Sequence, residues 1–161
     1  MNEQDAKKVL NTAITNACSI LIRTKEKSNI YKILYDVFIE TEAKILDIEA
    51  QCLVYPSLDF RGFPTPDIII DGEILSPTEK ILIELTNVNT QDPIVVLMDN
   101  MKVYPEWLLL LLQKLLSTRT FKNRAISPSV AFVAITNKAP NRNISFPSFL
   151  SRFTIIVNLD S

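Results

Sequence analysis

The segment LIRTKEKS, residues 21–28, contains the first side chains whose types and spacing suggest chemistry. It ends in Lys27 and Ser28, the pair that closes the phosphate-binding pattern G-x-x-x-x-G-K-[ST]. Leu21 and Glu26, however, stand where this pattern has its two glycines. The segment is therefore either a degenerate nucleotide site or a charged turn that precedes a helix.

Polar residues beside later apolar segments are candidates for the same site. Asp99 and Asn100 follow the apolar run at 94–98, Asn137 follows another apolar segment, and Arg152 precedes the last one. Each also has a purely structural interpretation. Asp99 and Asn100 fit a turn or a helix cap, Asn137 fits a loop, and Arg152 fits a surface arginine with a packed stem.

The elements that position these residues follow from hydrophobic periodicity. Apolar strands alternate with helices, which predicts an α/β fold: a three-layer sandwich with a mainly parallel central sheet. The unbroken apolar run at 94–98 is typical of a central parallel strand. Further strands are expected at 18–22, 43–48, 130–136 and 154–159, and helices at 5–16, 29–39 and 105–117.

Turn and cap signals mark the middle of the chain. Asp71 and Gly72 between apolar flanks predict a small β-hairpin over residues 68–75. Ser76, Pro77 and Glu79 predict a helix start in which serine caps, proline takes the first helical position and glutamate completes a capping box.

The leucine-rich stretch at 108–116 is predicted to lie in the core or in an interface. Its leucines are consecutive, so they cover more than one face of a helix. Unless both faces are buried in the sandwich, part of this surface is expected to meet another chain.

The composition limits the function classes. The 161 residues are expected to form one domain, 1–161, with 47% hydrophobic and 22% charged residues. A net charge of -1 provides no overall attraction for nucleic acid or anionic lipid, and histidine, the commonest general base, is absent. Cys18 and Cys52 lack metal-ligand spacing and are expected to be reduced core thiols of a cytoplasmic protein.

No membrane association is expected, because the N-terminus is polar through Lys8 and the longest apolar run, at 107–112, is too short to span a bilayer. Glycine is scarce: the chain has two, Gly62 and Gly72, where average usage would give roughly eleven. A backbone that wraps closely around phosphates is difficult to build without glycine.

In order and spacing, the segments over residues 15–161 resemble the AAA+ ATPase core, specifically its helix-2-insert branch. That branch contains the MoxR ATPases and the minichromosome maintenance (MCM) helicases. VYPEWLLLLLQKLLSTRTF is closer to MoxR, and NISFPSFLSRFTIIVNLD is closer to the helicases. The predicted hairpin falls where this branch inserts a hairpin into its second helix.

The resemblance implies a vestigial nucleotide site. Lys27 and Ser28 correspond to the Walker A remnant, and Asp99 corresponds to the Walker B aspartate that supports Mg²⁺. Asn137 corresponds to the sensor that orients water near the γ-phosphate. Arg152 corresponds to the arginine finger, which in this family reaches the nucleotide of the neighbouring subunit.

Departures from the family pattern predict that no catalytic set is intact. Glu26 would repel phosphate, and the Cβ atoms of Leu21 and Glu26 oppose a close backbone wrap. Asn100 replaces the glutamate that polarises water, and an amide is no base at neutral pH. The chain stops at Ser161, so the helical lid and second sensor are expected to be missing. No cofactor is expected, and ATP and Mg²⁺ would bind only if the vestigial site still functions.

Three function classes follow. The first is a catalytically inactive AAA+-like subunit or adaptor that acts through protein–protein contacts, either with itself or with an active AAA+ ATPase. The second is a weak ATP-binding protein or slow ATPase linked to DNA replication or remodelling.

The third is a metal-dependent nuclease of the PD-(D/E)xK type. Asp67 and the Glu84 to Thr86 segment match this pattern loosely, with Thr86 in place of the lysine. DNA binding by the predicted hairpin is disfavoured, because the hairpin has Asp67, Asp71 and Glu73 but no Lys or Arg.

Overall fold

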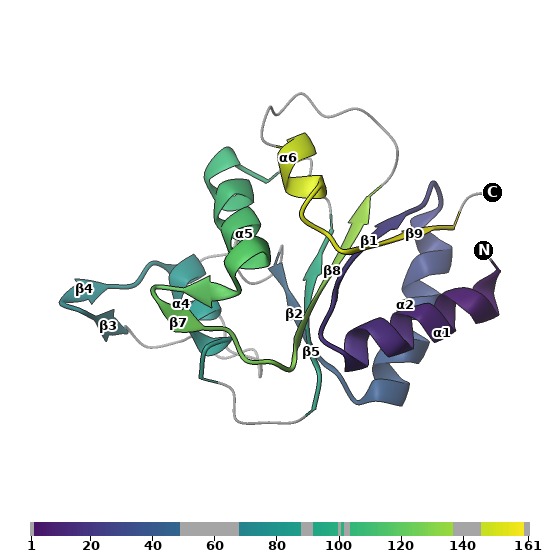
Figure 1. The fold of residues 1–161 in the computed structure, drawn as a ribbon, viewed down its shortest axis with the longest axis horizontal. Coiled ribbons are helices and arrows are strands. Elements are labelled where there is room, and N and C mark those ends of the chain that lie inside the picture. Colours follow the sequence, from purple (N-terminus) through teal and green to yellow (C-terminus); the bar gives the residue numbers. More distant parts are fainter. Residues whose placement is uncertain are drawn as a thin grey trace.

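The computed structural model describes residues 2–48, 68–87, 92–99, 101, 104–136 and 146–159. Its centre is a five-stranded sheet in the order β2-β5-β8-β1-β9, with every pairing parallel (Figure 1). The strands are β1 (Ser19–Arg23), β2 (Lys44–Asp47), β5 (Ile94–Met98), β8 (Val130–Thr136) and β9 (Ile155–Asn158). The predicted α/β architecture with a parallel central sheet is confirmed.

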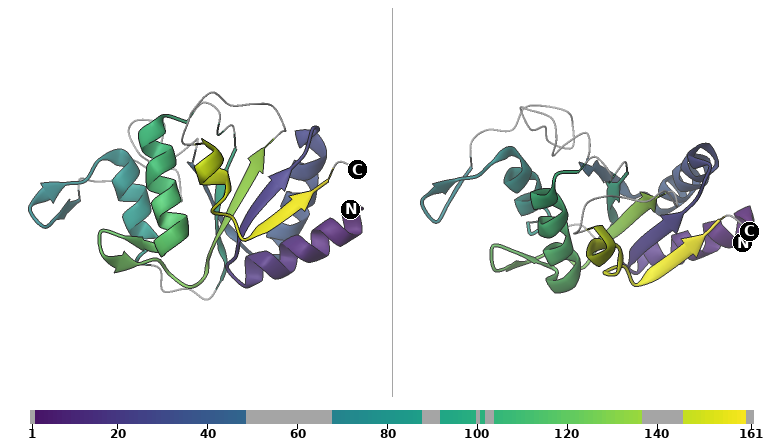
Figure 2. Two further views of the ribbon diagram at one scale, coloured as in Figure 1. Left: turned by 45° about the horizontal axis from the view of Figure 1, so that its top comes forward. Right: turned by 90° about the horizontal axis from the view of Figure 1, so that it is seen from above.

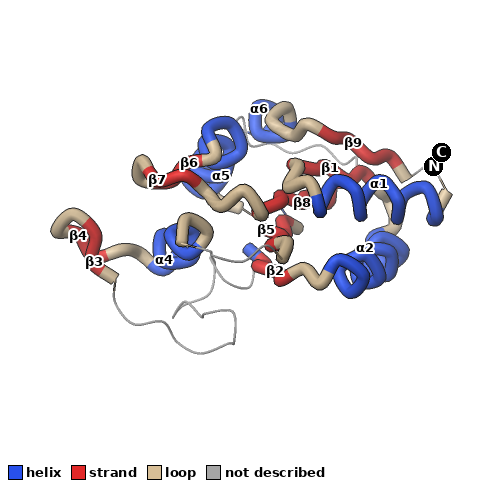
Figure 3. The backbone as a smooth tube through the Cα atoms, turned by 60° about the horizontal axis from the view of Figure 1, so that its bottom comes forward, coloured by secondary structure: helices blue, strands red, loops and turns tan. Residues whose placement is uncertain are grey.

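Helices cover both faces of this sheet (Figures 2 and 3). In β8, Ala131, Val133 and Ile135 pack on one side with residues of the first two helices. Val130, Phe132 and Ala134 pack on the other side with residues of the later helices. The first two helices are α1 (Glu3–Thr15) and α2 (Lys27–Thr41), and the later ones are α4 (Pro77–Glu84), α5 (Glu106–Thr118) and α6 (Phe146–Leu150).

The central strands β5 and β8 are buried at every position. Both have hydrogen-bonded neighbours on each side and helices on each face, so they contain apolar side chains without alternation. This burial is why the run at 94–98 could be recognised as a central strand from the sequence.

The start of α4 forms the predicted capping box. The Ser76 hydroxyl accepts a hydrogen bond from the Glu79 amide at 3.2 Å, and the Glu79 carboxylate accepts one from the Ser76 amide at 3.2 Å. Pro77 occupies the first helical position, where its missing N–H costs nothing. These local interactions fix where the helix begins.

Two small antiparallel hairpins lie outside the sheet. The predicted one consists of β3 (Ile69–Ile70) and β4 (Glu73–Ile74), and positive φ angles at Asp71 (52°) and Gly72 (80°) fit its expected turn. The second consists of β6 (Thr120–Phe121) and β7 (Arg124–Ala125) and was not predicted. Its turn residues, Lys122 and Asn123, also have positive φ although neither is glycine.

Among the described residues, no helix has both the length and the apolar character that a bilayer crossing requires.

Candidate functional site

The predicted site residues that the structure describes lie mainly at the carboxyl edge of the sheet. Asp99 directly follows β5, and Lys27 and Ser28 are the first two residues of α2, which follows β1. Strand β8 lies between β5 and β1, so these two strand ends are about 10 Å apart at normal strand spacing. The structure therefore brings Asp99 and the β1–α2 junction to one edge. Asn100 and Asn137, together with Cys52 and Asp67, lie outside the described residues.

The β1–α2 junction is short. Strand β1 ends at Arg23 and α2 begins at Lys27, so only Thr24, Lys25 and Glu26 connect them. The predicted strand end and helix start are therefore both displaced into the charged segment. Leu21 lies within β1, buried and paired with strands on both sides, so its Cβ is not part of the turn.

Hydrogen bonds close this connection tightly. The buried Thr24 donates its backbone N–H to the carbonyl of Thr136 at 3.0 Å and its hydroxyl to the carbonyl of Glu26 at 3.2 Å. A loop that surrounds a phosphate directs several successive N–H groups toward one centre. A three-residue connection whose first N–H is already bonded to β8 has little backbone left for that purpose.

Glu26 is the N-cap residue of α2. Its carboxylate makes no capping bond, but Oε2 accepts a hydrogen bond from Asn29 Nδ2 at 3.4 Å. The positive end of a helix favours a negative group at this position, which is the place where helices bind phosphate. The chain therefore supplies its own anion at the start of α2.

Asp99 is buried, with 7% of its surface exposed, at the end of a fully buried strand. Within the described ranges, no group of three or more His, Cys, Asp or Glu side chains is placed to hold a metal ion. Mg²⁺ in nucleotide sites is typically held by one or two carboxylates together with substrate phosphates. A metal at Asp99 would thus depend on a bound nucleotide.

Arg152 is exposed and lies away from the other predicted site residues. It follows α6 and stands two residues before Thr154, whose N–H and hydroxyl both donate to the carbonyl of Ser19 at the start of β1. The rise of β1 separates this amino edge from the carboxyl edge by about 13 Å. Arg152 is therefore not gathered with Lys27 and Asp99 within one chain.

Of the nuclease-like residues, the structure describes Glu84 and Thr86. Glu84 is the last residue of helix α4, and Thr86 follows in the turn, where its hydroxyl donates to the carbonyl of Ile83 at 2.7 Å. Residues two apart in helical backbone point about 200° apart around the axis. Glu84 and Thr86 thus face different directions.

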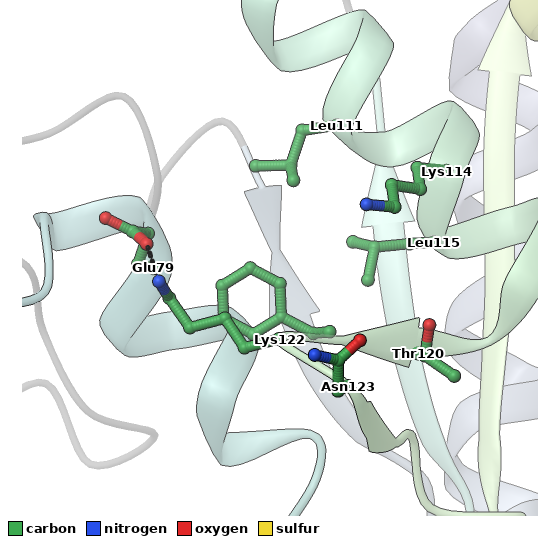
Figure 4. A pocket seen from close by; sticks show the side chains of 8 residues that line it. Glu79, Leu111, Lys114, Leu115, Thr120, Lys122 and Asn123 are labelled. Atoms are coloured by element: carbon green, nitrogen blue, oxygen red, sulfur yellow. Dashed lines mark ion pairs between the residues drawn. The ribbon is translucent and has the colours of Figure 1, made fainter. Parts of the chain in front are cut away.

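A pocket that the sequence did not predict lies between α4, α5 and the β6–β7 turn (Figure 4). It has a volume of about 280 Å³, and Lys122 closes one side through an ion pair with Glu79 at 3.0 Å. Its remaining lining residues are Leu111, Lys114, Leu115, Thr120, Phe121 and Asn123. The sequence did not predict this pocket, because the β6–β7 turn that forms one of its walls lacks glycine.

The charges of the Glu79–Lys122 pair are coupled. Partial burial by itself raises the pKa of Glu79, but hydrogen bonds from Lys122 and from the Ser76 amide outweigh it, so that the pKa lies below its usual value. The hydrogen bond to Glu79 raises the pKa of Lys122, with smaller contributions from the charges of Glu73 and Asp71. The hairpin carboxylates thus lie on the side of the molecule that contains the pocket.

Several solved structures have a similar fold. Two variants of RuvB from Thermotoga maritima align with 99% of this chain at a TM-score of 0.53, with 15% and 16% sequence identity. A predicted ATPase from Cytophaga hutchinsonii aligns with 99% of the chain at a TM-score of 0.55 and 11% identity. The chain spans 46% of the length of each of these proteins. These likenesses show that the fold is that of an AAA+ P-loop NTPase core.

No protein-family model matches the sequence, and no curated protein matches it by sequence.

Proposed function

We propose that this chain is a catalytically inactive AAA+-like protein that acts through protein–protein contacts, as a non-catalytic subunit or an adaptor. The observation that carries the proposal is the β1–α2 junction. It has three residues, is closed by the bonds of Thr24, and places the carboxylate of Glu26 at the start of α2. A nucleotide phosphate at this position would be repelled by that carboxylate and would find few free N–H groups.

The position of Arg152 supports a role toward another subunit. The side chain is exposed and lies beside the amino edge of the sheet, about 13 Å from the edge where a nucleotide would bind in the same chain. An arginine that acts on a neighbour's nucleotide must be exposed and cannot serve its own site. We therefore propose that the partner is an active AAA+ ATPase or another copy of this chain.

We also propose that the chain belongs to the helix-2-insert branch, which includes the MoxR and MCM proteins. The β3–β4 hairpin supports this assignment, because it lies between β2 and β5 in the sequence. Asn100 in place of the catalytic glutamate and Asn137 as a remnant of the water-orienting sensor are part of the same proposal.

The second candidate function is weak ATP binding or slow hydrolysis. Asp99 and the start of α2 share one sheet edge, where the ends of β5 and β1 are about 10 Å apart. A metal–phosphate site needs a carboxylate and a helix start at one edge in this way. Lys27, Ser28 and Asp99 would then bind ATP and Mg²⁺.

Phosphate release separates the two candidates. The purified chain would be incubated with ATP and Mg²⁺ beside an Asp99→Asn variant, which keeps the size of the side chain but removes its charge. We expect equal background release from both, with circular dichroism as the control for folding. Release by the wild-type chain that disappears in Asp99→Asn would favour the slow ATPase and contradict the inactive subunit.

A further inference from the structure

The pocket between α4, α5 and the β6–β7 turn combines an apolar floor with charged walls (Figure 4). Leu115 and Phe121 are buried, and Leu111 is partly buried and packs against the core. Apolar surface with a few polar groups at fixed positions is typical of a site for a small molecule. The charged residues of the lining are Glu79, Lys114 and Lys122.

Contacts of Lys122 fix one wall of the pocket. Its ammonium group forms the 3.0 Å ion pair with Glu79 and lies 5.9 Å from the centre of the Phe121 ring. Lysine is uncommon at the positive φ that Lys122 adopts, so these contacts help to hold the turn in place. The wall is thus pre-formed, and the charge of Lys122 is already engaged within the chain.

Lys114 supplies a second positive charge to the pocket. Its ammonium group points into the pocket between Leu111 and Leu115 (Figure 4). Among the residues that the structure describes, no carboxylate forms an ion pair with it. The lining has two lysines and one glutamate, so its net charge is +1.

This charge pattern favours a ligand with a single negative charge. A carboxylate can pair with Lys114 and leave the ion pair between Glu79 and Lys122 intact. A phosphate group has close to two negative charges, and the Glu79 carboxylate would repel it more strongly.

The size of the pocket limits the apolar part of the ligand. Its volume of about 280 Å³ is at the lower end for ligand sites, which begin at roughly 300 Å³. Such a volume suits one aromatic ring or a branched chain of similar size, and it is too small for a nucleotide.

We propose that this pocket binds a small carboxylic acid with an apolar body. The carboxylate pairs with Lys114, and the apolar body lies on Leu111, Leu115 and Phe121. None of the lining residues belongs to the β1–α2 junction or to the end of β5. The site therefore goes beyond the proposed function, and either proposal can fail without the other.

Three probe molecules separate the contributions of charge and ring. Phenylacetate has both, phenylacetamide lacks the charge, and acetate lacks the ring. Binding is followed by the amide chemical shifts of the isotopically labelled full chain at pH 7 and constant ionic strength. We expect phenylacetate to bind with a dissociation constant of roughly 1 to 10 mM, as is usual for a ligand of this size, and to shift the amides of residues 111–115 and 120–123. The other two should bind at least about threefold more weakly, as expected for the loss of a partly exposed ion pair or of the ring.

A matched pair of variants tests the role of Lys114. Lys114→Gln retains most of the side chain but removes its charge, so phenylacetate and phenylacetamide should bind this variant equally. Lys32→Gln removes an exposed lysine of α2 and should leave the preference for the acid unchanged. The same spectra show whether each variant is folded.

Three results would overturn the proposal. The first is that phenylacetate shifts no amide of the pocket at concentrations up to about 50 mM, well above the expected dissociation constant. The second is equal binding of phenylacetate and phenylacetamide to the wild-type chain. The third is a preference for the acid that survives in Lys114→Gln.

Discussion

Oε2 of Glu26 accepts a hydrogen bond from Nδ2 of Asn29 at 3.4 Å, which holds a carboxylate over the first turn of α2. In a phosphate-binding loop, glycine stands at the sequence position of Glu26, and the phosphate of the ligand occupies the space next to the helix start. The same helix end that could attract a nucleotide is thus already supplied with a negative charge from its own chain.

We expect this carboxylate to stabilise α2. Glu26→Gln should lower the free energy of unfolding by about 0.5 kcal/mol at low salt, because a negative group at a helix N-terminus is favourable, and salt should reduce the difference. Urea unfolding at two salt concentrations measures it. The control is Glu42→Gln at the C-cap of the same helix, where loss of a negative charge should be neutral or stabilising. Equal losses from the two variants would contradict the interpretation.

The Glu79–Lys122 ion pair predicts a pH-dependent contribution to stability. Folding lowers the pKa of Glu79, so the ionised carboxylate contributes to the free energy of unfolding. This contribution is fully present above the pKa of the unfolded chain, 4.5, and it is lost as the pH falls through the lower pKa of the folded chain. Glu79→Gln retains the capping box, since glutamine can replace glutamate there, but loses the ion pair. We expect this variant to be less stable than wild type at pH 7 and equal to it in strong acid.

Urea unfolding of both proteins from pH 7 down to pH 3 measures this convergence. Lys122→Met should show the same convergence, because it removes the other partner of the pair. A stability difference that stays constant with pH would mean that the pair contributes nothing to folding.

Arg119 is expected to contribute strongly to the stability of the fold. It is the C-cap of α5, and its guanidinium donates to the carbonyls of Val130 at 2.8 Å and Ser127 at 3.2 Å. Partial burial lowers its pKa, so the group loses hydration that these carbonyls replace. Arg119→Ala should cost about 2 kcal/mol, because it leaves partly buried carbonyls without a donor.

The control for this loss is Arg124→Ala on the exposed strand β7, which should change stability by less than about 0.5 kcal/mol. Both changes remove one arginine, so equal effects in thermal unfolding would show that charge rather than the hydrogen bonds of Arg119 is responsible.

Much of the fold could be predicted because its signals are local. The apolar runs at 94–98 and 130–136 match β5 and β8, and the Asp71-Gly72 turn and the Ser76 cap lie where their residue types require. The β6–β7 hairpin was missed because Lys122 and Asn123 adopt positive φ without glycine. Tertiary contacts favour that turn: Phe121 packs in the core, and Lys122 forms an ion pair with Glu79.

The leucine-rich helix was predicted in part. Leu108, Leu109, Leu112 and Leu115 are buried, whereas Leu110 is exposed, so the prediction that these leucines cover more than one face is confirmed. Cys18 was expected in the core but is only half-buried, because it lies in the connection that precedes β1.

The candidate site was less predictable than the fold. The sequence indicates which polar residues follow strands, but the residue at which β1 ends depends on pairing with two partner strands. Arg23 is paired with Thr136 of β8 and with Asn158 of β9, and this pairing extends the strand into the charged segment. The short β1–α2 junction is therefore a consequence of long-range register, which one sequence does not reveal.

The central claim is that the β1–α2 junction does not hold a nucleotide. Calorimetric titration of the purified chain with ATP and Mg²⁺, beside a Lys27→Ala variant, tests it most directly. We predict no heat of binding at high micromolar ATP for either protein. Binding by the wild-type chain that is lost in Lys27→Ala would show that a three-residue connection with Glu26 at its end still holds phosphate, and it would contradict the account.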